Sequence, residues 1–180
     1  MDKNLLTLGI NEQNTISHIS DCILTQYKTN SGEAAHTMIN EILSLIDDVN
    51  VPGETLAKVE NYKNSLLKTR LELSKDCVLF DKFLEMNRIN RDIISNDIEI
   101  LNNSLKDVSS SREDSYDIKA IQRRIEDLTL TNSVSSQLEV QLQLLSDGNR
   151  KTISLIENTV FTTVTLWKNR LFLEKQKSQL

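Results

Sequence analysis

The sequence predicts an all-α fold, an elongated antiparallel helical bundle or coiled-coil hairpin with two shorter N-terminal helices. The first indication is the rarity of helix breakers. From Glu54 to Leu180 the chain has no proline and a single glycine, Gly148. Proline removes a backbone donor and glycine adds backbone freedom, so a stretch that nearly lacks both favours long helices. With 180 residues, the chain is expected to form one domain over residues 1–180.

A hydrophobic repeat predicts the first long helix, over residues 54–106. Its steps alternate between four and three residues, which keeps one stripe facing a partner helix as in a coiled coil. Polar residues interrupt the repeat at Arg70, Asn87 and Arg91, and such residues set the register of paired helices at some cost in stability. The repeat is formed by Leu66, Arg70, Leu73, Cys77, Phe80, Leu84, Asn87, Arg91, Ile94, Ile98, Leu101, Leu105 and Val108. Apolar residues beside it indicate a second neighbour: Leu67, Leu71, Val78, Met86, Ile89, Ile93 and Ile100.

Polar, turn-forming segments place the remaining elements. Two short helices are predicted within residues 1–51, separated by a turn at 28–32. A serine-rich segment at 107–115 is predicted to reverse the chain. The second long helix is predicted over 115–178, continuous or slightly kinked near Gly148, because the apolar pattern survives that glycine.

Composition excludes several classes of protein. The net charge is -5 and charged residues of both signs make up 26 % of the chain. This balance lacks the basic excess that neutralises phosphates, so we expect no nucleic-acid partner. No apolar run approaches the roughly 18 residues of a transmembrane helix, and the N-terminus has no secretion pattern. Together with two cysteines that lack CxxC spacing, these features predict a cytoplasmic protein.

Motifs for catalysis or metal binding are missing from the sequence. His18 and His36 match no common ligand spacing, and no phosphate-binding glycine loop occurs. We therefore expect no enzyme activity, no metal and no cofactor. Cys77 is interpreted as a core residue, and the role of Cys22 is left open. Four carboxylates on the long helix are interpreted as a solvated face: Glu85, Asp92, Asp97 and Glu99.

Basic residues gather towards the C-terminus, around Trp167. They either bind an anion or a partner helix, or they oppose the dipole at a helix end. Trp167 itself either packs in the core, which is the commoner case, or marks a docking surface. The basic residues are Arg150, Lys151, Lys168, Arg170, Lys175 and Lys177.

Three collinear stretches carry a family resemblance: residues 79–87 (LFDKFLEMN), 121–131 (IQRRIEDLTLT) and 162–169 (TTVTLWKN). They resemble the toxic-anion resistance family, the TelA-like tellurite resistance proteins. The likeness extends over roughly residues 16–173, and the sequence departs from the family at Thr165, usually proline, and at Gln143, usually arginine. The residues of these motifs that we single out as candidates for binding a partner or an anion are Arg123, Arg124, Trp167, Lys168, Asn169 and Arg170.

The resemblance implies an all-helical cytoplasmic bacterial protein of tellurite, toxic-anion or envelope-stress resistance. Together with the long seam, it predicts a non-enzymatic scaffold that acts through protein–protein interaction, including self-association through helix faces. Two alternatives stay open. One is direct oxyanion binding by the basic C-terminal cluster or by the thiols. The other is a generic coiled-coil adaptor whose likeness to the family is accidental.

Overall fold

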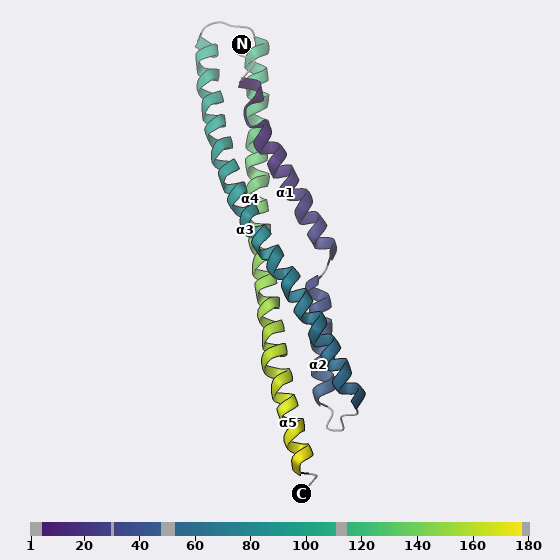
Figure 1. Cartoon of the computed structure of the whole chain (residues 1–180). Coiled ribbons are helices and arrows are strands. Elements are labelled where there is room, and N and C mark those ends of the chain that lie inside the picture. Colours follow the sequence, from purple (N-terminus) through teal and green to yellow (C-terminus); the bar gives the residue numbers. More distant parts are fainter. Residues whose placement is uncertain (1–4, 30, 48–52, 111–114, 178–180) are drawn as a thin grey trace. The chain divides into compact units, whose positions relative to one another are not determined.

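The computed structural model describes residues 5–29, 31–47, 53–110 and 115–177 (Figure 1). The predicted all-α class is confirmed, since the elements found in these ranges are helices and none is a strand. In chain order the elements are the 3-10 turn η1 (Leu5–Thr7), α1 (Ile10–Thr29), α2 (Ser31–Asp47), α3 (Gly53–Ser110), α4 (Ser115–Glu157), the π-helix η2 (Asn158–Thr163) and α5 (Val164–Lys177).

The helices extend further into the predicted turns than expected. Helix α3 runs on to Ser110, and α1 and α2 leave only residue 30 between them. The centres of the two predicted turns, at 30 and 111–114, lie outside the described residues, as do residues 48–52.

The chain divides into two compact units. Unit 1 comprises Met1–Lys28 and Phe80–Leu144, and unit 2 comprises Thr29–Leu79 and Leu145–Leu180. Helices α3 and α4 therefore contribute one part to each unit. The organisation as a single domain stays a prediction.

Unit 1 is built from α1 and from parts of α3 and α4, which run antiparallel to one another. Its buried residues, which include the polar Asn87, Asp97 and Ser135, recur at steps of three, four or seven, because those steps return to one face of a helix. The buried apolar residues of unit 1 are Ile16, Ile19 and Ile23 of α1, Phe80, Phe83, Ile94 and Leu101 of α3, and Ile121, Leu128, Leu138 and Leu142 of α4.

Gly9 sets the close approach of α1 to α4 within unit 1. Its φ of +74° lies in the left-handed region, which L side chains rarely adopt. A Cβ atom built on Gly9 would also lie 2.5 Å from a methyl carbon of Leu128. Glycine therefore suits both the left-handed backbone and the narrow space beside Leu128. The Gly9 carbonyl accepts the first hydrogen bond of α1, from the Gln13 N–H at 3.0 Å.

Unit 2 has its own core, formed by α2, the first part of α3, the end of α4 and α5. The ion pairs and hydrogen bonds between α3 and the later helices show an antiparallel register, since Glu60 meets Lys168, Arg70 meets Glu157 and Cys77 meets Ser146. The buried cluster consists of Ala35, Ile39, Ile42, Val59, Leu66, Leu73, Ile156, Val160, Val164 and Trp167.

The π-helix η2 shifts the inward face of α5 by one residue. Its wide turn is closed by a bond from the Val164 N–H to the Thr159 carbonyl, five residues back. An uninterrupted repeat through Ile156 and Thr159 would next turn residues 163, 166 and 170 inward. Val164 and Trp167 are buried instead, and Leu171 packs against them. Sequence reasoning missed this turn, although the successive steps of four from Ile156 to Val160 to Val164 indicate it.

Helix α4 passes through Gly148 without a break. A Cβ atom at this position would meet nothing within 4 Å, so packing does not require glycine there. In the parts of the chain that the structure describes, no helix is both long enough and apolar enough to cross a membrane.

Candidate functional site

The six candidate residues taken from the sequence motifs belong to different units. Arg123 and Arg124 lie on α4 in unit 1, whereas the segment 167–170 lies on α5 in unit 2. The two groups are therefore treated as two candidate sites, and the surroundings of each are described within its own unit.

Arg124 ties the start of the described chain to α4. Its Nε donates to the Leu8 carbonyl at 3.0 Å, its Nη2 donates to the same oxygen, and its Nη1 donates to Oε1 of Gln13 at 3.0 Å. Gln13 in turn donates from Nε2 to the Thr131 hydroxyl at 2.9 Å. Hydrogen bonds from a charged guanidinium are stronger than neutral ones, so Arg124 positions α1 on α4.

Asp97 of α3 lies buried beside this network. Burial raises the pKa of its carboxyl above the ordinary value of an aspartate, and the nearby charge of Glu12 on α1 raises it further. The Arg124 guanidinium on α4 opposes both effects by lowering that pKa. Ionisation of this carboxyl therefore lowers the stability of the folded state.

We expect Asp97→Asn to stabilise the protein at about pH 7 and to have less effect at about pH 3. The folded-state pKa of Asp97 lies above its value in the unfolded chain, so folding favours the protonated form. That contribution is present at low pH and is lost as the pH rises through the folded-state pKa, whereas asparagine stays neutral throughout. Urea unfolding of both proteins across this pH range measures the difference. A difference in the free energy of unfolding that does not change with pH would contradict a raised pKa for Asp97.

Arg123 lines a surface groove next to Arg124. The groove has a volume of about 360 Å³. Arg123 and Lys119 are exposed, and neither side chain makes an ion pair or hydrogen bond within the described ranges. The groove is lined by Leu6, Lys119, Ala120, Arg123, Arg124 and Asp127, so three cations and one carboxylate surround it.

On α5 the candidate residues point to different surroundings. Trp167 is 7 % exposed and packs in the unit 2 core, which is the commoner of the two interpretations made from the sequence. Lys168 forms an ion pair with Glu60 of α3. Arg170 pairs with Glu174 at 3.0 Å on its own helix, and Asn169 is exposed. In this motif, Trp167 therefore belongs to the core and Lys168 connects α5 to α3, so neither is a freely exposed binding residue.

Lys168 and Glu60 also line a second groove, of about 410 Å³, between α3 and α5. Its remaining walls are mostly apolar, with Phe172 exposed at its edge. The groove is lined by Leu56, Glu60, Lys168, Leu171, Phe172 and Lys175.

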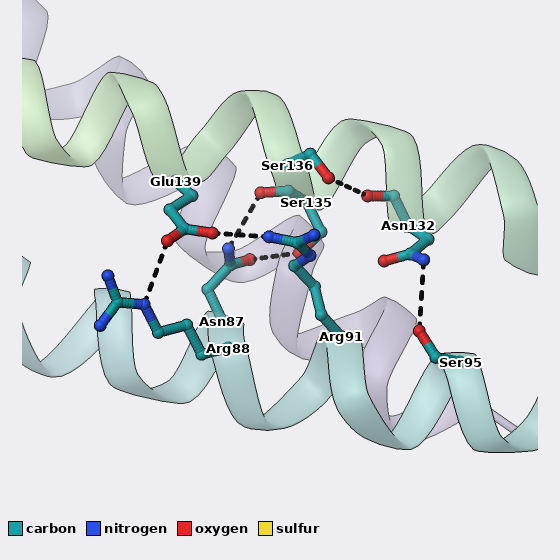
Figure 2. Close-up of polar contacts among 8 residues, drawn as sticks. All are labelled: Asn87, Arg88, Arg91, Ser95, Asn132, Ser135, Ser136 and Glu139. Atoms are coloured by element: carbon teal, nitrogen blue, oxygen red, sulfur yellow. Dashed lines mark hydrogen bonds and ion pairs between the residues drawn. The ribbon is translucent and has the colours of Figure 1, made fainter.

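A polar layer joins α3 to α4 inside unit 1 (Figure 2). The fully buried Asn87 donates from Nδ2 to the Ser135 carbonyl at 2.9 Å, and the Ser135 hydroxyl donates to Asn87 Oδ1 at 2.8 Å. Glu139 accepts from Arg91 at 2.6 Å and from Arg88 at 3.0 Å. The polar interruptions Asn87 and Arg91 of the sequence repeat therefore have partners on α4, which local spacing could not identify.

The third polar interruption, Arg70, is paired in unit 2. Its Nη2 lies 2.6 Å and its Nε 2.7 Å from Oε1 of Glu157. The polar layer of unit 1 is less complete, because three buried atoms in the described chain lack a hydrogen-bond partner: Asn90 Nδ2, Arg91 Nε and Asn132 Oδ1. Such layers specify how helices align, and their unpaired groups cost stability.

The two thiols lie in different units. Cys77 is buried in unit 2 and its thiol contacts the Ser146 carbonyl at 3.8 Å. Cys22 is half-buried in unit 1, with its sulfur 3.8 Å from Nε2 of His18. Within the part of the chain that the structure describes, neither cysteine forms a disulfide bond. Across the described segments, no three His, Cys, Asp or Glu residues are grouped as metal ligands would be.

Comparison with known proteins assigns the family. The family model of the toxic anion resistance protein (TelA) matches residues 55–179. The chain belongs to the TelA family. The matched region contains α4, η2, α5 and all but the first two residues of α3, and with them all six candidate residues.

Curated relatives of this TelA-family chain have modest identity to it. A TelA-like protein of Staphylococcus saprophyticus is 21 % identical, in a match that covers 93 % of this chain and 57 % of the relative. A TelA-like protein of Staphylococcus aureus strain Mu50 is 23 % identical, over 76 % of this chain and 40 % of the relative. The chain thus spans about half the length of the curated relatives that it matches. No solved structure matches it.

Proposed function

We propose that this TelA-family chain acts in resistance to tellurite and other toxic anions, or to envelope stress, as a non-catalytic cytoplasmic scaffold that binds other proteins. Family membership supports the resistance role. The scaffold role is supported by how the helices use their charges. Arg70, Arg91 and Lys168 all pair with carboxylates of a neighbouring helix and so serve helix alignment.

The observation that carries the scaffold role is a row of exposed apolar residues on α3. Met86, Ile89, Ile93 and Ile100 follow the helix at coiled-coil spacing, yet each is exposed. Exposed apolar residues that gather on one face, unlike scattered single ones, are typical of protein-binding surfaces. A helix face of this kind recognises another protein more readily than it performs chemistry.

Deletion of the gene in its own host is expected to lower survival in tellurite, and the intact chain is expected to restore it. Crosslinking of the tagged chain inside complemented cells is expected to recover a protein partner. Unchanged survival after deletion would contradict the resistance role. Restored survival without any crosslinked partner would contradict the scaffold role, as would turnover of tellurite by the purified chain.

Direct oxyanion binding is the second candidate function, and one observation favours it. Arg123 and Lys119 face a groove with no ion pair of their own in the described chain. Calorimetric titration of tellurite into the wild type, Arg123→Gln and the Cys22→Ser, Cys77→Ser double variant separates the basic groove from the thiols. No heat of binding to the wild type would remove this candidate. The family match already removes the interpretation that the likeness to TelA proteins is accidental.

A further inference from the structure

Helix α3 carries a second apolar row in unit 1 that its own core does not use. We call Met86, Ile89, Ile93 and Ile100 the outer row. Their side chains are 39–51 % exposed, whereas Ile94 and Leu101, one residue further on, are fully buried. Successive residues of an α-helix differ by about 100°, so the outer row faces well away from the buried stripe.

The outer row has the spacing of a coiled-coil seam. Met86, Ile93 and Ile100 are seven residues apart and correspond to position a of the heptad, and Ile89 occupies position d. Asn96 occupies the next d position and is the one polar interruption between Met86 and Ile100 in this row. The row therefore extends over two heptads, a length suited to one partner helix lying along α3.

An acidic row follows one edge of the outer row. Glu85, Asp92 and Glu99 each precede an a-position residue directly, which places them at position g. All three are exposed, and none makes a hydrogen bond or ion pair with the described residues. The two arginines of this stretch do not pair with these acids, because Arg88 and Arg91 are paired with Glu139 of α4.

The other edge of the outer row is covered. Asp97, at position e, is buried beside Gly9 and Glu12 at the start of α1. An approaching helix therefore meets apolar side chains bordered on its open side by three unpaired carboxylates. Charges at positions e and g set partner choice in helix pairing, so the matching surface is basic.

We infer that this face of α3 binds a helix of another protein whose apolar stripe is flanked by lysine or arginine. This inference rests on the proposed scaffold function and names the partner's chemistry. A second copy of the chain fits less well. Two-fold antiparallel pairing of this face with itself would set the row of Glu85, Asp92 and Glu99 against the same row of the other copy, and like charges repel.

Two synthetic helical peptides of four heptads test the inference on the full chain, by fluorescence anisotropy. Both carry leucine at positions a and d, one with lysine and one with glutamate at positions e and g. We expect the lysine peptide to bind at least about tenfold more tightly than the glutamate peptide, and to weaken as salt is raised. A lysine peptide of the same composition in scrambled order controls for simple charge attraction.

Variants of α3 separate the two features of the face. Ile89→Ser combined with Ile93→Ser is expected to weaken binding of the lysine peptide by more than about tenfold. Neutralising the three acids together, as Glu85→Gln, Asp92→Asn and Glu99→Gln, is expected to weaken it about five- to tenfold. The matched control is Leu130→Ser with Glu126→Gln, an exposed pair on α4 that is expected to leave binding unchanged. Circular dichroism checks that each variant stays folded.

Equal binding of the lysine and glutamate peptides, or unchanged binding by either α3 variant, would overturn the inference. Sedimentation that shows self-association of the wild type but not of the Ile89→Ser, Ile93→Ser variant would assign the face to a second copy and overturn it as well. These failures differ from failure of the scaffold function. If only the face is wrong, the intact chain still crosslinks its partner in cells and restores survival in tellurite.

Discussion

Replacing Trp167 by alanine is expected to lower the free energy of unfolding by about 3–5 kcal/mol. The side chain is buried in the unit 2 core, so its removal loses apolar burial and leaves a cavity that neighbouring helices cannot fully close. Trp167 is the only tryptophan of the chain, so the variant has no indole fluorescence. Unfolding in guanidinium chloride is therefore followed by circular dichroism for both proteins.

The residue just before Trp167 provides a matched control. Leu166 is 63 % exposed on the same helix, and Leu166→Ala is expected to change the free energy of unfolding by no more than about 0.5 kcal/mol. The comparison also tests the π turn, because an uninterrupted repeat would turn Leu166 inward. A larger loss from Leu166→Ala than from Trp167→Ala would show that the inward face of α5 is assigned wrongly.

Asn87→Ala is expected to lower the free energy of unfolding by about 1–3 kcal/mol. The substitution removes both hydrogen bonds between Asn87 and Ser135. The buried Ser135 hydroxyl thereby loses its acceptor, Asn87 Oδ1. An unsatisfied buried polar group costs more than the hydrogen bond contributed when it was made. Urea unfolding of the variant measures the loss.

A double variant distinguishes this cause from simple loss of volume. Asn87→Leu with Ser135→Ala makes the pair apolar, so most of the stability lost in Asn87→Ala is expected to return. Asn87→Leu alone is expected to remain destabilised, because the Ser135 hydroxyl stays buried. If the stability lost in the double variant equalled the sum of the losses in Asn87→Leu and Ser135→Ala, the buried polar pair would not be the cause.

The buried stripe of α3 could be predicted from the sequence because helix geometry alone determines it. A residue faces the same direction as those three, four and seven positions away, so spacing identifies the inward face without knowledge of the neighbour. Leu66, Leu73, Phe80, Ile94 and Leu101 were predicted in this way, and all are buried. The same spacing places the polar residue Asn87 on that stripe, and Asn87 is buried as well.

The partners of those residues could not be predicted in this way. Ser135 lies 48 positions from Asn87, and Glu157 lies 87 positions from Arg70. Which residues meet depends on the register between helices, and single-helix periodicity contains no information about it. Arg124 is a similar case: its motif marked it, but its main partner is the backbone carbonyl of Leu8, which no side-chain pattern reveals.

The wide turn of η2 also affects how this chain is aligned with its relatives. A π turn contains one residue more than the α-helical path that it replaces, so a protein without it keeps the same inward faces with one residue fewer. A one-residue gap inside a helix, at 158–163, would then be structurally correct. At identities of 21–23 %, omitting that gap would match Trp167 to the neighbour of its true counterpart, and every later comparison along α5 would be displaced in the same way.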